Sequence, residues 1–509
     1  MRKVVLVPLD ERPCNTRFPT MLAAMTDWQL VTPEGSLLGQ KKVPAKVESL
    51  VDWAEKEAQT ATGMIVAMDM WLYGGIVPSR LHHIQLDDLR KRLASLAELK
   101  RQRPNLILYA YSLIMRNPTY SSDDEEPDYY ATWGRDIHLK GKYEHQQKLG
   151  LLSEAGATEL ETIQARLPDA YFKDYITRRA INRHMNEAII DLVVEGIIDF
   201  LIIPQDDASP YGLTAMDQAL VRNHIDAHHV GHKVYMYPGA DETANTLLSR
   251  MIHSVQGEQP KVHPTYTSEQ AKYLIPLYED RPLHETVKYH IIASGGVLAE
   301  GIADADILWV IHAPPSRQLN ASQADQRSIE YDAFINLPAA LETIRYALDV
   351  RKLPVVVGDV AYGNGADLRL IAMLRQAGLL FRLAGYAGWN TSSNSLGTCL
   401  PQGMLYRLYG PSLAHQRFLG HRYAEDAGYC ASVRQTVIQT VLPKMGLHYF
   451  LVDAPKGEVA AIVHTQLQQW LDKNINDAQY QIKITQCVLP WQRMFEVGLK
   501  VEVHAYEVP

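Results

Sequence analysis

The sequence predicts an α/β protein built as a (β/α)8-type parallel barrel with a small C-terminal α+β appendage. Short apolar runs recur along the chain, and most are separated by segments long enough for a helix, which is the pattern of parallel strands joined by crossover helices. Several runs end in boxes rich in carboxylates, amides and glycines. Parallel strands present their carboxyl ends at one edge, so these boxes predict a shared polar pocket.

The apolar runs are numerous enough for a closed barrel, which needs eight strand and helix units. In chain order, the predicted strands are residues 4–8, 64–68, 106–111, 200–203, 234–237, 288–293, 307–311, 355–357 and 381–384.

Amphipathic segments between the strands are predicted to be the outer helices. Residues 86–99 and 175–194 have apolar side chains at intervals of three and four residues, which is the period of a half-buried helix. Residues 117–150 interrupt this rhythm with an acidic and aromatic segment. We predict an insertion there, after the third strand, where barrels commonly build lids and substrate walls.

The last part of the chain has a different pattern. We predict a catalytic barrel domain over residues 1–420 and a small α+β domain over 421–509. Residues 495–504 alternate strictly between apolar and polar side chains, as in a half-exposed antiparallel strand. The other elements predicted in this domain are a helix from residue 421, a strand at 449–452, a helix at 458–473 and a segment at 481–488.

Composition limits the partners. The chain has 509 residues, 47% of them hydrophobic, and a net charge of −8 without any Lys/Arg cluster, which argues against nucleic acid and against an anionic membrane surface. The first apolar run is too short for a signal peptide or a membrane span. Four widely spaced cysteines favour a reducing compartment. We expect a cytoplasmic protein, and homo-oligomerisation stays open.

The segment LIIPQDDASPYG supplies the predicted catalytic residues. An apolar run stops at Pro204, and Asp206 and Asp207 follow before a turn. A single Asp after a strand is commonly a helix cap or a turn former, whereas an adjacent pair is more specific. Two neighbouring negative charges raise one pKa, so one carboxyl can stay protonated as a general acid.

The boxes at the other strand ends supply the predicted substrate-binding residues. Structural roles stay open for some of them, because an Arg between two acids can form an internal salt bridge and acids before a helix can cap it. The predicted binding residues are Asp10, Glu11, Arg12, Asp69, Tyr73, Arg116, Asp241, Glu242, Asp359, Asn364, Trp389, Asn390 and Asn394.

Cofactor motifs do not stand out in the sequence. The first strand is not followed by GxGxxG, and GxxxxGK[ST], GxSxG, HxH and HExxH do not occur. We also find no Asp, His and Glu set at metal-ligand spacing, so we expect no cofactor and no tightly bound transition metal. Acidic residues alone could still hold a magnesium ion.

Paired carboxylates, amides and aromatic rings are the residue types of carbohydrate chemistry. One acid protonates the leaving oxygen, a second group attacks or stabilises the anomeric centre, and an aromatic ring packs on the sugar. We predict a glycoside hydrolase for a small sugar or amino-sugar glycoside. One alternative is a non-enzymatic sugar-binding sensor. Another is a divalent-metal-assisted lyase, isomerase or phosphoester hydrolase with Asp69, Asp206, Asp241 and Asp359 as ligands.

Two resemblances accompany these motifs. The boxes PLDERP, DMWLYGG, QDDASPYG, PGADE and YAGWNTSSNSLG resemble those of an uncharacterised bacterial family known as a domain of unknown function. The acid pair and the Trp/Asn box are also similar to those of substrate-assisted barrel β-N-acetylglucosaminidases. That resemblance implies that Asp206 orients the acetamido group, that Asp207 is the general acid, and that Trp389, Asn390 and Asn394 bind the sugar.

Overall fold

The computed structural model describes residues 2–506, which divide into two compact units. The first unit contains the chain up to Glu11, Trp28–Ala244 and Tyr278–Asp280. The second contains Arg12–Asp27, Asn245–Leu277 and the chain from Arg281 onward. The predicted domain boundary at residues 420 and 421 falls inside the second unit, within α16 (Leu413–Arg422).

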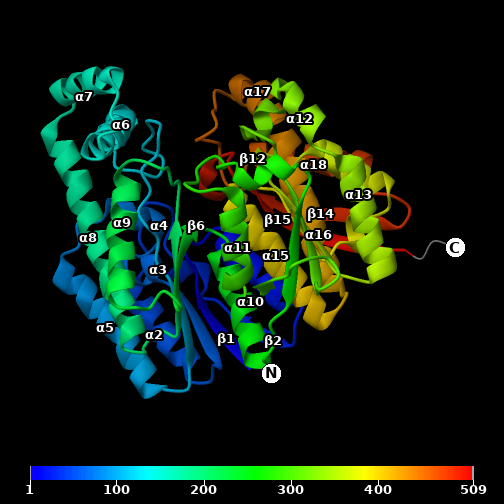
Figure 1. Ribbon diagram of the computed structural model, residues 1–509, viewed down its shortest axis with the longest axis horizontal. Coiled ribbons are helices and arrows are strands. Elements are labelled where there is room, and N and C mark those ends of the chain that lie inside the picture. Colours follow the sequence, from blue (N-terminus) through cyan, green and yellow to red (C-terminus); the bar gives the residue numbers. More distant parts are fainter. Residues whose placement is uncertain (1, 507–509) are drawn as a thin grey trace. The chain divides into compact units, whose positions relative to one another are not determined.

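The first unit is built on an open parallel sheet with the strand order β2-β1-β3-β4-β5-β6 (Figure 1). The four last residues of β1 are fully buried and apolar, as expected for a strand covered by helices on both faces. The chain leaves β1 toward one side to form β2 and then reverses to build the rest of the sheet. The strands are β1 (Arg2–Val7), β2 (Trp28–Val31), β3 (Gly63–Ala67), β4 (Ile107–Tyr111), β5 (Phe200–Gln205) and β6 (Val234–Pro238).

The helices of the first unit include two that were predicted by periodicity: α5 (Leu86–Gln102) and α8 (Asp169–Val194). The predicted insertion contains a loop and α6 (Tyr130–Lys148), which packs with α7 (Glu154–Arg166) at one end of α8 (Figure 1). A separate small core with Tyr130, Ile163 and Tyr175 holds this region. The other helices are α2 (Val47–Ala58), α3 (Met68–Tyr73), α4 (Ile76–Leu81) and α9 (Leu213–Ala227).

The second unit is built on a five-stranded parallel sheet with the order β13-β11-β9-β7-β8. Its chain again starts on an inner strand, moves to one edge and then reverses, so the two units share the same winding. The strands are β7 (Lys261–Tyr266), β8 (Val297–Leu298), β9 (Ile307–His312), β11 (Val355–Asp359) and β13 (Gly385–Ala387), and β10 (Leu319–Asn320) pairs separately with β12 (Tyr362–Gly363).

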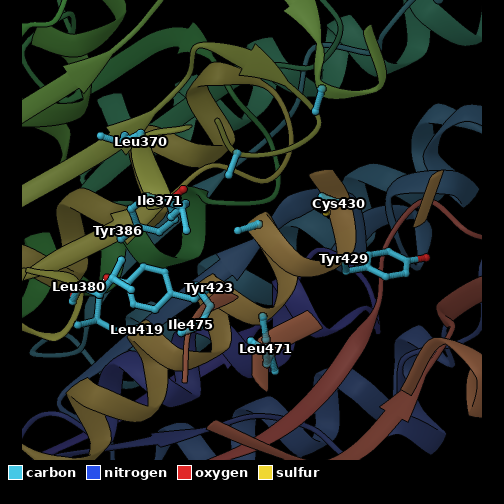
Figure 2. Packing of buried hydrophobic residues seen from close by; sticks show 14 of the residues in the cluster. Leu370, Ile371, Leu380, Tyr386, Leu419, Tyr423, Tyr429, Cys430, Leu471 and Ile475 are labelled. Carbon is cyan, nitrogen blue, oxygen red and sulfur yellow. Dashed lines mark hydrogen bonds between the residues drawn. The ribbon is translucent and has the colours of Figure 1, made fainter. Parts of the chain in front are cut away.

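The C-terminal elements belong to the large core of the second unit. Figure 2 shows part of this core, where Tyr386 and Tyr423 pack near Leu471 and Ile475. The predicted terminal helix is confirmed as α18 (Glu458–Asn474) and the alternating strand as β15 (Gly498–Ala505), paired antiparallel with β14 (Tyr480–Val488). The remaining helices are α1 (Pro13–Ala23), α10 (Thr243–Gln256), α11 (Leu283–Ala293), α12 (Ile329–Phe334), α13 (Leu337–Arg345), α14 (Leu368–Gln376), α15 (Ser392–Tyr409) and α17 (Arg434–Thr440).

The predicted barrel is wrong, because no sheet among residues 2–506 closes on itself. Residues 288–293 were predicted as a strand and lie in α11, since their short apolar run fits a buried helix equally well. The strand predicted at 381–384 begins only at Gly385, and no strand forms at 449–452, where a single bridge joins His448 and Leu451. Strands β2 and β7 were not predicted. In β7, Pro264 argues against a strand, because proline has no amide hydrogen to donate to a neighbouring strand.

No helix among residues 2–506 has both the length and the apolar character required to cross a membrane.

Candidate functional site

The carboxyl edge of the first sheet contains the point where the strand order reverses, between β1 and β3. In open parallel sheets, ligands bind in the crevice outside the carboxyl ends of the strands at such a point. Asp10 follows β1 and Asp69 follows β3, and both carboxylates are buried. The winding of the sheet therefore places two acids where a ligand site is expected.

Tyr111 lies at the end of the next strand, β4, and acids surround its phenol. Burial raises the pKa of Tyr111 well above its ordinary value, and the charges of Asp10, Asp69, Asp241 and Glu242 raise it further. The phenol oxygen has no hydrogen-bond partner among residues 2–506. The ends of β1, β3, β4 and β6 thus converge on one acidic cluster, with a phenol able to donate a hydrogen bond.

Asp69 has a perturbed carboxyl in this cluster. Burial raises its pKa to about 6, although hydrogen bonding to its charged form works in the opposite direction. The Leu113 amide donates a hydrogen bond of 3.0 Å to Oδ2. Asp69 is consequently ionised at neutral pH but close enough to its pKa to exchange a proton.

Glu242 has a more strongly perturbed carboxyl than Asp69. Burial is the main cause that raises its pKa to about 8, and the charge of Asp241 adds to the shift. The Ala240 amide donates a 2.9 Å hydrogen bond to Oε2, whereas Oε1 has no partner among the described residues. The tight turn at Gly239 (φ +150°) leaves room for this carboxyl, because a Cβ at that position would lie 2.1 Å from Oε1.

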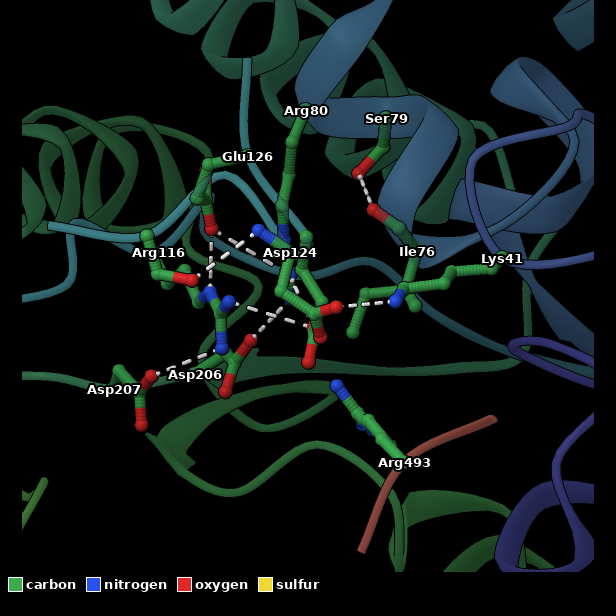
Figure 3. Close-up of polar contacts among 12 residues, drawn as sticks. Lys41, Ile76, Ser79, Arg80, Arg116, Asp124, Glu126, Asp206, Asp207 and Arg493 are labelled. Atoms are coloured by element: carbon green, nitrogen blue, oxygen red, sulfur yellow. Dashed lines mark hydrogen bonds and ion pairs between the residues drawn. The ribbon is translucent and has the colours of Figure 1, made fainter. Parts of the chain in front are cut away.

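Arg80 holds the first member of the predicted catalytic pair. Its guanidinium donates to Oδ2 of Asp206 at 2.7 Å and to Glu125 at 2.8 Å, and it lies 3.6 Å from Glu126 (Figure 3). Arg80 is 2% exposed, so these ion pairs are formed largely out of water. Buried charges of this kind must be paired, because an unpaired one is costly.

Arg116 binds Asp207, the second member of the predicted catalytic pair. It donates to Glu126 at 2.7 Å and to Oδ2 of Asp207 at 3.2 Å, and it lies 3.4 Å from Glu125 (Figure 3). Four carboxylates therefore face these two guanidinium groups. A ligand with several hydroxyl groups could be held by such alternating donors and acceptors.

The two adjacent acids differ in backbone conformation. Asp207 has φ +40°, a left-handed conformation that aspartate adopts only occasionally, whereas Asp206, the first residue after β5, does not have a positive φ. Burial raises the pKa of both carboxyls, and for Asp206 the charge of Asp207 raises it further. Strained backbone is concentrated at functional sites, so this turn supports a role for the pair.

Glu125 and Glu126 come from the predicted insertion, and its loop is tied down by buried hydrogen bonds. The Asn117 amide donates to Tyr130 at 3.0 Å and to Tyr175 at 3.3 Å. Tyr175 in turn donates to the Arg116 carbonyl at 2.9 Å. The insertion thus holds Glu125 and Glu126 against the two arginines. The charge of Arg80 also acts on Asp69 and lowers its pKa, so we refer to the acidic cluster and this arginine network together as the acidic site.

The second unit has a polar cluster of its own at the carboxyl edge of its sheet. His312 at the end of β9 bonds Thr267 at 2.9 Å and Asp367 at 3.0 Å through its two ring nitrogens. Asp359 accepts a 2.8 Å hydrogen bond from Tyr386, and burial raises its pKa to about 6. Both ring nitrogens of His312 are thus satisfied within the cluster, whereas Oδ1 of Asp359 has no hydrogen-bond partner among the described residues.

The predicted Trp/Asn box also lies in the second unit. The Trp389 indole nitrogen donates to the Asn394 carbonyl at 3.3 Å, and the ring packs edge to face against Phe18 at 5.6 Å between centroids. The Asn390 carbonyl accepts a 2.9 Å hydrogen bond from the Asn364 amide. In this conformation, Trp389 is 4% exposed and serves packing; its role in sugar binding stays a prediction.

The predicted site residues thus divide between the units. Arg12 lies in the second unit, where its guanidinium sits 4.5 Å from the centre of the Trp491 ring, and Glu11 accepts from the Lys41 amide at 2.9 Å in the first. The first unit also contains Asp10, Asp69, Tyr73, Arg116, Asp206, Asp207, Asp241 and Glu242, and the second contains Asp359, Asn364, Trp389, Asn390 and Asn394.

Sequence reasoning missed several groups of the acidic site. Tyr111 ends a predicted strand but carries no motif. Arg80 belongs to the polar segment MDMWLYGGIVPSR after the second predicted strand but was not among the predicted site residues. Glu125 and Glu126 were part of the acidic run used to predict the insertion, so their charge was the available signal. Their pairing with distant arginines depends on the tertiary structure.

Comparison with known families gives one match. A family model described as a protein of unknown function, DUF4127, matches residues 4–500. No curated protein matches the chain.

Proposed function

The chain belongs to the DUF4127 family of proteins of unknown function, and from the chemistry of its carboxyl edge we propose that it is a glycoside hydrolase. The substrate would be a small sugar or amino-sugar glycoside bound at the acidic site of the first unit. The observation that carries this proposal is the difference in pKa between two acids of that site. The pKa is about 6 for Asp69 and about 8 for Glu242.

These two pKa values support different roles for the two acids, one as acid and one as base. At pH 7, Glu242 is mostly protonated and Asp69 mostly ionised. Glycoside hydrolysis needs such a pair, because one carboxylic acid protonates the leaving oxygen while a carboxylate activates water or attacks the anomeric carbon. We assign Glu242 as the general acid and Asp69 as the carboxylate partner.

The arginine network would bind the substrate. Asp206 and Asp207 are held by Arg80 and Arg116, and their remaining oxygens could accept hydrogen bonds from sugar hydroxyls. The pair also stays the second candidate for acid and base, because burial raises the pKa of both carboxyls. Substitutions of Glu242 and of Asp207 distinguish these two assignments of the general acid.

The test is hydrolysis of a panel of nitrophenyl glycosides and N-acetylglucosaminides. We expect Glu242→Gln to lower kcat by about 10²- to 10⁴-fold, the usual contribution of a general acid. The exposed Glu161→Gln on α7 is the matched control and should retain full activity. If Asp207→Asn loses activity while Glu242→Gln keeps it, the acid role belongs to the aspartate pair. If the wild type hydrolyses no glycoside of the panel, the proposal is overturned.

The same assay distinguishes the two alternatives. A divalent-metal-assisted enzyme would lose activity on chelation and recover it with Mg²⁺ or Mn²⁺. A sugar-binding sensor would give a thermal shift with a sugar that mass spectrometry recovers unchanged. Activity that persists in chelator would support acid and base chemistry by the carboxyls alone.

A further inference from the structure

A second polar cluster of the first unit lies at the opposite edge of the sheet from the acidic site. It consists of Asp191 near the end of α8 and of His224 and His228 at the end of α9. These helices lead into β5 and β6, so their last turns lie at the amino ends of the strands. The cluster is therefore separate from the groups proposed for hydrolysis.

The two histidines share one face of a helical turn. The His228 amide donates to the His224 carbonyl at 3.2 Å, so the turn continues through both residues. Their ring centroids are 4.6 Å apart. Histidines four residues apart on a helix can coordinate one ion together. The sequence did not indicate this set, because the pair lacks the Glu of HExxH and Asp191 lies 33 residues away from His224.

Asp191 completes a set of three ligands. His224 Nε2 lies 2.8 Å and His228 Nε2 lies 3.9 Å from the same Oδ1 of Asp191. One ligand atom from each residue lies within 4.8 Å of the others. Bond lengths of about 2.0–2.1 Å around a tetrahedral zinc place neighbouring ligand atoms about 3.3 Å apart, and the two measured distances lie on either side of that value.

The cluster is also accessible. The side chains of His224, His228 and Asp191 are 26%, 40% and 47% exposed, so an ion can enter without unfolding and a water can occupy the fourth position. Two imidazoles and one carboxylate are the ligands of Zn²⁺ and similar late transition metals, whereas Mg²⁺ and Ca²⁺ prefer oxygen ligands.

We propose that Asp191, His224 and His228 form a binding site for a zinc-class divalent ion, which joins the ends of α8 and α9. The ion would bind the folded chain and not the separated helices of the unfolded chain. Metal binding would therefore stabilise the first unit by mass action.

The test is isothermal titration of the metal-stripped full chain with ZnCl₂, together with thermal unfolding with and without Zn²⁺. We expect one site per chain and a higher midpoint of unfolding with zinc. His224→Asn and His228→Asn should each weaken binding by more than roughly 10-fold, since even outer-shell partners of metal ligands are worth about 10- to 100-fold. Asp191→Asn should also weaken it, and circular dichroism checks that each variant is folded.

His229→Asn is the matched control. This exposed neighbour is not one of the three ligands, and asparagine tolerates its left-handed backbone (φ +56°), so zinc affinity should be unchanged. Equal affinity in all variants, or no zinc uptake by the wild type, would overturn the site. Binding is measured without turnover, so this result is independent of the proposed hydrolase activity.

Discussion

At the scale of residues, the acidic site shows how burial and neighbouring groups give two carboxyls different pKa values. Asp69 and Glu242 both contribute to the acidic surroundings of Tyr111. Asp69 receives the Leu113 amide, which opposes the effect of burial on its pKa. Glu242 is more deeply buried and has Asp241 as a charged neighbour. The two pKa values consequently lie on either side of neutrality.

This separation predicts a bell-shaped dependence of kcat/KM on pH. Activity should rise as Asp69 loses its proton at a pKa of about 6 and fall as Glu242 loses its proton at a pKa of about 8. The measurement is kcat/KM for a nitrophenyl substrate hydrolysed by the wild type. In Glu242→Gln, the residual activity should no longer fall on the alkaline side. A wild-type profile that is flat across this range would contradict both assignments.

At the scale of elements, the turn after β6 determines where the proposed acid can sit. Gly239 and Glu242 lie between the end of β6 and the start of α10. The glycine has a positive φ, and a Cβ added to it would lie 2.1 Å from Oε1 of Glu242. The strand, the turn and the helix start together position one carboxyl.

Gly239→Ala is expected to displace the Glu242 carboxyl and to destabilise the protein by on the order of 1–3 kcal/mol, because it adds backbone strain and a clash. Urea unfolding measures this loss. Gly196→Ala is the control, since Gly196 also has a positive φ (+74°) but nothing within 4 Å of an added Cβ. If the contact with Glu242 matters, Gly239→Ala should cost less in a Glu242→Ala background, and an equal cost in both backgrounds would contradict it.

The elements also show where sequence patterns are reliable. The periodicity of α5, α8 and α18 and the alternation in β15 predicted these elements correctly, because each is long and half-buried. Strand β7 contains a proline, and residues 288–293 form a short apolar run. Local sequence cannot distinguish a buried strand from a buried helix in such runs.

At the scale of the whole molecule, several buried carboxyls make stability depend on pH. Burial raises the pKa of Asp69 and Asp359 to about 6 and that of Glu242 and Asp426 to about 8. Unfolded aspartate and glutamate titrate near 4. At these four carboxyls the folded chain binds more protons than the unfolded chain between these values, so the stability that they contribute falls as pH rises.

We expect the free energy of unfolding of the wild type, relative to that of Glu242→Gln, to fall by roughly 3 kcal/mol between pH 5.5 and 8.5. Burial raises the pKa of Glu242 from near 4 to about 8, and each pH unit between the two values is worth about 1.4 kcal/mol. Urea unfolding at a series of pH values measures this change. The comparison isolates Glu242, because buried histidines with lowered pKa values, such as His82 and His290, contribute equally to both proteins. A difference between the two proteins that is constant over this interval would show that Glu242 is ionised in the folded protein.

The sequence by itself determined that the chain is α/β, that its strands end in polar boxes and that Asp10, Asp69 and Asp241 belong to those boxes. Local apolar patterns and strand-end chemistry are sufficient for these conclusions. Only the tertiary structure decided that the strands form two open sheets, because closure depends on which strands pair. It also decided which acids meet, since the pairing of Arg80 with Asp206 joins residues 126 positions apart.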